Sequence, residues 1–270
     1  MQKRLNFVIV FLILLAEFSY SQISVCSWNL KDLGQSKSES ELNLIADIIK
    51  NYDVIAIQEV VSGSEGPQAV ARLHDILNRK GSKWEYSVSN STSGSSYKSE
   101  RYAFIWKPSK LTLIGKTWLE EKYNNEIDRE PFYATFQSEN KRFTLVNFHA
   151  ITKAKQPETE IKYFKYLPDE YPNLNLIFCG DFNLPQSHTV FNPLKVSGYH
   201  PILKNQKTSL RQKCLNDDCL ASEYDNIFYN SNKITLVNTG VIHFYKKIIT
   251  FENARLISDH IPLFFHFKIN

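Results

Sequence analysis

Short apolar runs divided by polar segments make up most of this chain, and their lengths are those of β-strands. The residues in these runs are mostly β-branched or aromatic, which favours strand over helix. They predict strands at 23–29, 53–59, 101–107, 111–118, 132–138, 142–148, 174–179, 224–229, 234–238 and, in two overlapping segments at the end of the chain, 254–263 and 262–268.

Apolar residues recur at helical spacing in other segments. Residues 41–50 show this spacing, with Ser38 and Ser40 before them as candidate N-caps. A second helix is predicted to begin at Pro67 and to end before Gly81, since proline suits a first turn and glycine a stop.

A third, short helix is predicted at 157–167, and the Ser- and Gly-rich stretch 90–96 is expected to be an exposed loop. Residues 187–222 show no readable pattern. Early alternation of strand and helix, followed by strand hairpins, predicts an α/β protein with a mixed sheet or two sheets and helices outside.

Several predicted strands end in residues suited to metal or phosphate chemistry. A rigid sheet presents a reactive site by gathering such side chains at one rim. In the first half of the chain the strand ends supply Asn29, Glu59 and His149, and in the second half Asp181, Asp225 and His260. This loose repetition predicts two facing sheets that share one rim.

The composition agrees with a large folded unit. The chain has 270 residues, of which 43% are hydrophobic and 13% aromatic, enough for one large core or two small ones. Because there is no internal linker or short repeat, we expect one domain at 22–270. The net charge of +4 is weakly permissive of an anionic partner such as nucleic acid.

The first residues have the pattern of a signal peptide, 1–21. Lys3 and Arg4 precede an apolar run that is too short to span a bilayer, and Ser19 and Ser21 suit a cleavage site before Gln22. An uncleaved N-terminal anchor is the alternative. We expect a secreted or periplasmic protein without stable membrane association after cleavage.

An exported protein folds in an oxidising compartment, where pairs of cysteines can form disulfides. Cys26 and Cys179 lie within apolar strands and are predicted to be small buried hydrophobic residues. Cys214 and Cys219 flank a polar loop and are expected to close a small disulfide, with a zinc site as the weaker alternative.

The sharpest short motif is Gly180-Asp181-Phe182-Asn183. Asp181 and Asn183 are two apart, so in an extended chain both point to one side, where they suit a hard cation and a phosphate oxygen. A turn that ends a strand is an equal alternative for this motif alone. His149 and His260, with Glu100 and Asp225 as orienting carboxylates, form a candidate acid–base pair.

The ordered set of motifs resembles the endonuclease/exonuclease/phosphatase superfamily, and within it the deoxyribonuclease I branch and its bacterial secreted relatives. The resemblance runs from about Ile23 to the C-terminus, and eight pieces in the right order make coincidence implausible. The pieces are Ser27-Trp28-Asn29-Leu30, Ile57-Gln58-Glu59-Val60, Ser96-Tyr97-Lys98-Ser99-Glu100-Arg101-Tyr102, Arg129-Glu130-Pro131, Asn147-Phe148-His149, Gly180-Asp181-Phe182-Asn183, Glu223-Tyr224-Asp225 and Ile257-Ser258-Asp259-His260.

The resemblance implies a four-layer α/β sandwich, two packed mixed β-sheets flanked by helices. It also implies a divalent metal, usually Mg²⁺, with Mn²⁺ or Ca²⁺ as further candidates. We also expect a monomer. By the same resemblance Asn29 and Glu59 would hold the metal, with Asp259 as a further carboxylate. Asp181 would bind metal or activate water, and Asn183 would hold a phosphate oxygen.

The acid and base implied by the resemblance are His149 and His260, oriented by Glu100 and Asp225. The resemblance also implies a secreted, metal-dependent endonuclease that cleaves DNA to 5′-phosphate and 3′-hydroxyl ends by His-assisted attack of water.

The resemblance further implies that Arg101, Tyr97 and Arg129 grip DNA in or beside the minor groove. The chain departs from the pattern near these groove contacts. Lys31 stands where deoxyribonuclease I has an arginine and is a further candidate DNA contact, and Ser99 is an insertion.

The sequence is compatible with two other functions. A secreted phosphodiesterase acting on a lipid headgroup, as sphingomyelinases do, needs an exposed apolar hairpin. Phe244 and Tyr245 lie in a suitable region, but Lys246 and Lys247 follow at once. A catalytically inactive DNA-binding relative is the second alternative, and the intact set of acid, base and metal candidates argues against it.

Overall fold

The computed structural model describes residues 22–94 and 99–270, and most of its strands form two mixed β-sheets. In spatial order the first sheet, sheet A, contains β14 (Ile234–Val241), β15 (Leu263–Ile269), β1 (Ile23–Leu33), β2 (Val54–Val61), β4 (Glu100–Trp106) and β3 (Glu85–Val88). The second, sheet B, contains β10 (Tyr199–Pro201), β13 (Asp225–Asn230), β9 (Leu176–Asp181), β8 (Lys141–His149), β7 (Phe132–Ser138) and β5 (Thr112–Leu113), with β6 (Trp118–Leu119) also beside β7.

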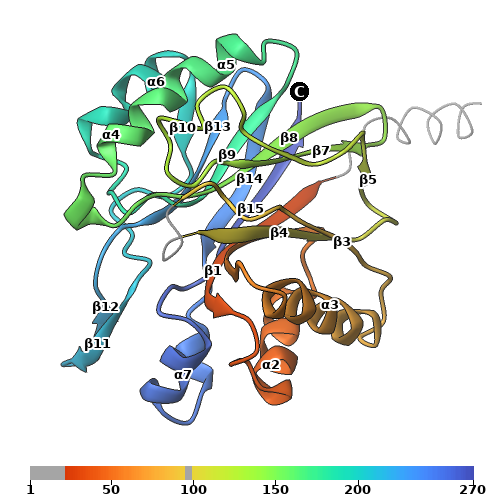
Figure 1. The fold of residues 1–270 in the computed structure, drawn as a ribbon, viewed down its shortest axis with the longest axis vertical. Coiled ribbons are helices and arrows are strands. Elements are labelled where there is room, and N and C mark those ends of the chain that lie inside the picture. Colours follow the sequence, from red (N-terminus) through yellow and green to blue (C-terminus); the bar gives the residue numbers. More distant parts are fainter. Residues whose placement is uncertain (1–21, 95–98) are drawn as a thin grey trace, which may run out of the picture.

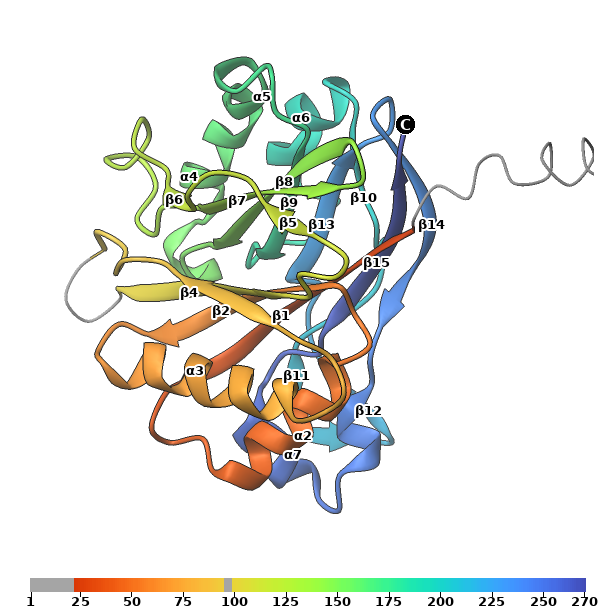
Figure 2. The ribbon, with the colours of Figure 1, turned by 90° about the vertical axis from the view of Figure 1, so that its right-hand side faces the viewer.

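Helices cover the outer faces of both sheets (Figure 1, Figure 2). Sheet A is covered by α2 (Glu39–Ile49), α3 (Glu65–Asn78) and α7 (Phe251–Ile257), and sheet B by α4 (Glu158–Ile161), α5 (Leu167–Glu170) and α6 (Asn192–Val196). The remaining elements are a hairpin of β11 (Leu210–Leu215) and β12 (Asp218–Leu220) and the 3₁₀ turns η1 (Lys153–Lys155), η2 (Lys162–Tyr166), η3 (Thr189–Phe191) and η4 (Phe244–Lys247).

Three apolar clusters separate the four layers. Alternate residues of β1 show how they arise, because Val25 points into the cluster between the sheets and Cys26 into the cluster beneath α2 and α3. The third cluster joins sheet B to its helices, with Phe148 and Phe178 facing Phe164. The predicted α/β sandwich of two mixed sheets is therefore confirmed.

The predicted cap of the first helix is also confirmed. Ser38 accepts a hydrogen bond from the backbone N–H of Glu41, and the Glu41 carboxylate accepts one from the backbone N–H of Ser38, which together form a capping box. The second helix begins at Glu65, two residues before Pro67, and Gly81 follows its end with a φ of +95°.

The prediction that 254–263 is strand was wrong. Thr250 accepts a hydrogen bond from the backbone N–H of Asn253 and starts helix α7, which places Ala254 and Ile257 on one buried face. This three-residue spacing is helical, and Ala, Arg and Leu within it are strong helix formers. The overlapping prediction of a strand at 262–268 was right, as β15.

Other element predictions were right only in part. The segment 111–118 contains two short strands rather than one, and 157–167 contains α4 and the 3₁₀ turn η2 before α5 begins. The unreadable region 187–222 holds α6, β10 and the β11–β12 hairpin. The loop prediction at 90–96 holds for 90–94, and its last residues, like the predicted signal peptide 1–21 and Tyr97, lie outside the described residues.

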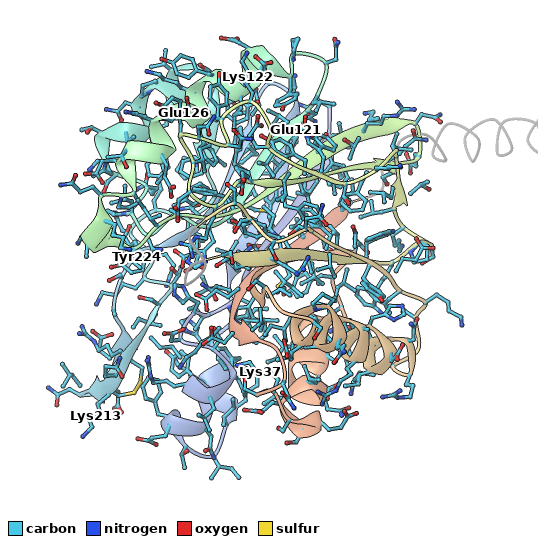
Figure 3. The ribbon with its side chains drawn as sticks, viewed as in Figure 1. Lys37, Glu121, Lys122, Glu126, Lys213 and Tyr224 are labelled. Carbon is cyan, nitrogen blue, oxygen red and sulfur yellow. A yellow bond between two sulfur atoms is a disulfide. The ribbon has the colours of Figure 1, made fainter. Side chains whose placement is uncertain are left out.

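The cysteine predictions are confirmed. Cys214 and Cys219 form a disulfide across the β11–β12 hairpin, visible beside Lys213 in Figure 3. Cys26 and Cys179 are free and buried. Within the described ranges, no helix has the length and apolar character needed to cross a bilayer.

Gly180 is required where β9 passes close to β8. Its φ is +137°, and a Cβ atom there would lie 1.9 Å from the backbone oxygen of Phe148. We therefore expect Gly180→Ala to lower the free energy of unfolding by about 3 kcal/mol or more, measured by urea denaturation. Gly115→Ala is the control, because its φ is +74° with open space around it, and it should lose only about 1 kcal/mol. Equal losses would contradict the steric argument.

Candidate active site

The candidate site lies where strand ends of both sheets meet. Parallel pairing of β8 with β9 places His149 opposite Asp181, and antiparallel pairing of β9 with β13 places Asp225 opposite the same Asp181. Sheet A contributes Asn29 from β1, Glu59 from β2 and Glu100 from β4. His260 lies in the segment between α7 and β15 and forms an isolated β-bridge with Ser209. The structure thus brings together the acid, base and carboxylate candidates of the sequence.

His149 forms the first imidazole–carboxylate pair. Its Nδ1 lies 2.9 Å from Glu100 Oε2, and the same oxygen accepts a hydrogen bond of 3.0 Å from Arg129 Nη1. Burial alone would lower the pKa of His149, but Glu100 outweighs it and the pKa is raised. Because Nδ1 is engaged by Glu100, Nε2 is the nitrogen left to face the site.

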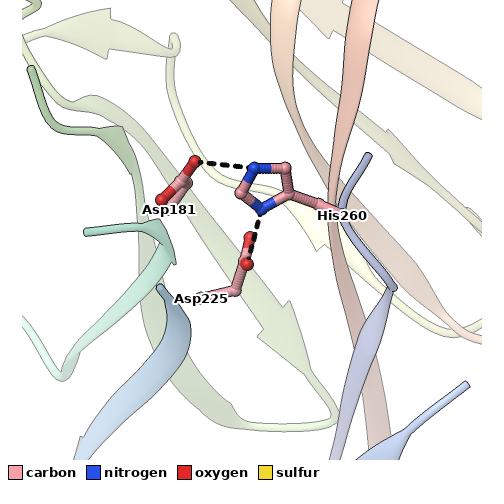
Figure 4. A group of neighbouring side chains, drawn as sticks. All are labelled: Asp181, Asp225 and His260. Carbon is pink, nitrogen blue, oxygen red and sulfur yellow. Dashed lines mark hydrogen bonds and ion pairs between the residues drawn. The ribbon is translucent and has the colours of Figure 1, made fainter. Parts of the chain in front are cut away.

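His260 forms the second pair. Its Nδ1 lies 2.7 Å from Asp225 Oδ2, an interaction drawn as a dashed line in Figure 4. The Thr208 hydroxyl donates to the same oxygen at 2.7 Å. Burial alone would lower the pKa of His260, but Asp225 and Asp181 raise it well above its ordinary value.

Asp181 lies between the two imidazoles. Its Oδ2 is 3.5 Å from Nε2 of His149 and 3.5 Å from Nε2 of His260. Burial would raise its pKa, but the two imidazoles outweigh burial and hold it below the ordinary value. A buried carboxylate between two proton-carrying nitrogens is suited to charge stabilisation in acid–base chemistry.

The predicted metal ligands Asn29 and Glu59 meet Asp181 at the same place. Asn29 Nδ2 donates to Glu59 Oε1 at 2.8 Å and to Asp181 Oδ2 at 3.3 Å, so carboxylates of both sheets converge on one point. Burial raises the pKa of Glu59, which indicates that nearby positive charges and hydrogen-bond donors do not fully compensate its negative charge. Carboxylate and carboxamide oxygens suit Mg²⁺, provided that Asn29 turns its oxygen toward this point.

Two other carboxylates bear on the metal prediction. The ligand atoms of Asp181, Asp225 and His260 lie within 4.8 Å of one another, but the Asp225–His260 hydrogen bond uses this imidazole as half of a pair (Figure 4). Asp259 is 34% exposed and lies 3.8 Å from Arg255, so its part in metal binding stays a prediction.

Glu59 and Asn183 have strained backbones. Their φ angles are +59° and +52°, and Glu59 lies at a bulge where the register of β2 shifts against both neighbouring strands. A left-handed conformation costs a glutamate about 1–3 kcal/mol and persists where the surroundings impose it. Asn183 donates from its backbone to Asp181 and from its side chain to the Ala150 carbonyl. These contacts hold Asn183 beside the central aspartate.

The predicted DNA contacts are engaged in internal hydrogen bonds. Arg129 is buried against Glu100 and the Ala150 carbonyl, and Arg101 donates to the carbonyls of Ser62 and Ser89. The Lys31 ammonium donates to the carbonyl of Arg255. Their contact with DNA stays a prediction, as does that of Tyr97, which lies outside the described residues.

Sequence reasoning missed several residues that hold the site. Thr208 binds Asp225 through a hydroxyl that also accepts from the backbone N–H groups of Tyr224 and Asp225. Ser258 donates to the Asn29 carbonyl and accepts from the His260 backbone, and so ties β1 to the second imidazole. No local pattern identifies Thr208, because it lies in the unreadable region, whereas Ser258 stands directly before Asp259-His260.

A pocket of about 370 Å³ opens beside Glu59 and Glu100. Arg129, Thr152 and Lys155 also line it. The pocket therefore lies beside Glu100, the carboxylate that holds His149.

The pKa shifts of His260 and Asp181 give a pH-dependent stability in chelator-treated protein. Protonated His260 stabilises the folded state because its pKa is higher there than the value of 6.5 in the unfolded chain. This stabilisation is complete below pH 6.5 and is lost as the pH rises through the pKa of the folded state. Ionised Asp181 stabilises the folded state above about pH 4, because its pKa is lowered by folding, and this stabilisation is lost on acidification. The stability advantage of wild type over His260→Gln should therefore fall as pH rises above 6.5, measured by urea unfolding in EDTA. An advantage that grows with pH would contradict the assignment.

Two imidazole–carboxylate pairs around a shared aspartate, on the rim of a two-sheet α/β sandwich, have the geometry of a general acid–base site. The sequence profile described as the Endonuclease/Exonuclease/phosphatase family matches residues 26–260. The chain belongs to this family.

Its relatives are consistent with this membership. A deoxyribonuclease of Thioalkalivibrio sp. (strain K90mix) is 26% identical over 99% of this chain and 77% of the relative. Human deoxyribonuclease gamma is 27% identical over 94% of this chain and 88% of its own length. A crystal structure of an endonuclease/exonuclease/phosphatase family protein from Bacteroides thetaiotaomicron superposes with a TM-score of 0.69 at 16% identity, over 94% of this chain and all of the other. That last similarity shows the fold.

Proposed function

We propose that this protein is an exported, metal-dependent endonuclease that hydrolyses DNA phosphodiester bonds and leaves 5′-phosphate and 3′-hydroxyl ends. The observation that carries the proposal is Asp181 Oδ2 at 3.5 Å from both imidazole Nε2 atoms. The deoxyribonucleases among the relatives support DNA as the substrate. The N-terminal pattern of residues 1–21 and the Cys214–Cys219 disulfide support export.

The two imidazoles divide the proton transfers. One Nε2 removes a proton from the attacking water, and the other donates a proton to the leaving 3′ oxygen. Glu100 and Asp225 each hold the opposite nitrogen, which fixes the ring orientation and stabilises the imidazolium form. Asn183 binds a non-bridging phosphate oxygen through its amide, and Asp181 stabilises each imidazole in the state in which it carries a proton on Nε2.

Asn29, Glu59 and Asp181 are the residues that would hold a divalent ion, with Mg²⁺ as first choice and Mn²⁺ or Ca²⁺ as further candidates. When bound, the ion supplies Lewis-acid stabilisation of the negative charge on the phosphoryl oxygens. Buried carboxylates outnumber the fixed positive charges at this rim, and this imbalance favours a cation.

A supercoiled-plasmid assay over a panel of divalent ions tests the proposal. We expect conversion to nicked and then linear DNA with Mg²⁺ and loss of cleavage in EDTA. Ligation of the products without prior kinase treatment checks for 5′-phosphate and 3′-hydroxyl ends. An intact plasmid under every ion, with a folded and monomeric protein, would reject the nuclease function.

A lipid-headgroup phosphodiesterase is disfavoured by the position of its candidate hairpin. Phe244 and Tyr245 are 1% and 9% exposed and pack in the cluster beneath sheet A, so they present no apolar surface to a membrane. Release of phosphocholine from sphingomyelin vesicles, measured beside the plasmid assay, separates the two activities. An inactive DNA-binding relative would bind the plasmid and release neither product.

A further inference from the structure

Glu160 is a buried carboxylate outside the catalytic set. It lies on α4 and is 2% exposed. Its Oε1 accepts the backbone N–H of Ile151 at 2.7 Å, and its Oε2 accepts the backbone N–H of Asp128 at 3.1 Å. One side chain thereby joins two segments that are distant in sequence.

Both of these segments carry a neighbour that belongs to the site. Asp128 directly precedes Arg129, whose guanidinium holds Glu100 Oε2 at 3.0 Å. Ile151 directly follows Ala150, whose carbonyl accepts a hydrogen bond of 3.0 Å from Asn183 Nδ2 and another from Arg129. The Ala150 carbonyl therefore contacts both Arg129, which supports the Glu100–His149 pair, and Asn183, the proposed phosphate ligand. We call this carbonyl, with its two donors, the junction.

We propose that Glu160 is a positioning residue for phosphodiester hydrolysis, which fixes Arg129 and the Ala150 carbonyl relative to each other. This role rests on the proposed function. A carboxylate is needed because two N–H groups require two acceptors, and a glutamine would turn an N–H donor toward one of them. A displaced Ala150 carbonyl would move Asn183 away from the phosphate and loosen the support of His149.

Glu120 provides a matched comparison, because it is equally buried and also accepts several hydrogen bonds. Its exposed fraction is 1%, and its partners are the hydroxyls of Tyr133 and Tyr171 and the backbone of Lys122. Glu120→Gln therefore loses a buried carboxylate without disturbing the Arg129–Ala150 contact. It controls for the stability cost of the substitution alone.

The first test compares Glu160→Gln with Glu120→Gln in plasmid cleavage. Burial raises the pKa of Glu160 to about 7, so the assay is run at pH 8, where the carboxylate is ionised. We expect kcat of Glu160→Gln to fall about 10- to 100-fold while KM stays within about threefold, because misplaced groups lower the rate more than binding. Glu120→Gln should keep kcat within about twofold, the range of a substitution away from the site.

The second test does not depend on activity. In ¹H–¹⁵N spectra, the side-chain amide of Asn183 should shift in Glu160→Gln and stay in place in Glu120→Gln, because its acceptor is the Ala150 carbonyl. If Glu160→Gln does not fold, Glu160→Asp replaces it, since its shorter side chain cannot reach both N–H groups. An inactive wild type would reject the nuclease function, while the spectra would still report on the junction.

The outcomes are separable. A kcat equal to that of the control overturns the positioning role. A fall in kcat with an unshifted Asn183 amide also overturns it, because the loss then does not pass through Ala150. A combined loss in Glu160→Gln/Arg129→Lys that is smaller than the product of the single losses supports a shared route.

Discussion

Replacing His260 by alanine should lower the turnover of plasmid cleavage by about two to four powers of ten, the usual contribution of a positioned acid or base. The reason is geometric, since Asp225 holds Nδ1 at 2.7 Å and directs Nε2 to within 3.5 Å of Asp181. His149→Ala should cause a loss of the same size, because Glu100 holds its ring in the same way. Single-turnover rates with saturating Mg²⁺ measure both losses.

The double variant gives a sharper result. If the two imidazoles act in one step, removing the second should cost much less than removing the first, because residues that act as a unit are not additive. His200→Ala is the matched control, since His200 is an exposed histidine on β10, and it should keep wild-type turnover. Full activity in both His149→Ala and His260→Ala would refute the acid–base assignment.

Loss of the Glu59 carboxylate should produce the second large effect, a weaker response to divalent ions. Outer-sphere substitutions at metal sites cost roughly 10- to 100-fold in affinity, so a ligand substitution should raise the Mg²⁺ concentration for half-maximal activity by at least about tenfold. Glu59→Gln keeps the shape of the side chain and its strained position at the β2 bulge. Activity titrations against Mg²⁺ and Mn²⁺ measure the shift.

Ion binding also has a readout without substrate. A ligand that binds the folded state at about 100 times its Kd stabilises it by about 2.7 kcal/mol, so Mg²⁺ should raise the melting temperature of wild type and much less that of Glu59→Gln. Glu121→Gln, at an exposed glutamate visible in Figure 3, should respond as wild type does. An equal response of Glu59→Gln would place the ion elsewhere.

The identity of the elements was largely readable from the sequence, because periodicity is a local property. Continuous apolar runs predicted β1, β2 and β9, and the candidate caps Ser38 and Ser40 indicated the start of α2. The error at 254–263 has a local cause too, since the cap at Thr250 outweighed the apolar character of the segment. Short elements such as β5 and η2 have too few residues for a period to appear.

The sequence identified which residues form the site, but not how they are arranged in space. Strand ends identified Asn29, Glu59, His149, Asp181 and His260, because catalytic residue types follow apolar runs there. Their distances depend on strand order and register, such as the pairing that sets Asp181 between His149 and Asp225. Backbone strain at Glu59 and Asn183 left no signal, because both residue types also occur in ordinary strands and turns.

The sequence by itself determined the longer strands, the two longest helices, the disulfide and the chemical character of the rim, since each depends on residues close together in the chain. The tertiary structure decided which carboxylate meets which imidazole, that Thr208 and Ser258 support the second pair, and that Glu160 joins two distant loops. These contacts form only when the two sheets pack together with fixed strand registers. The residues that meet are far apart in the sequence, so no local sequence pattern predicts their contact.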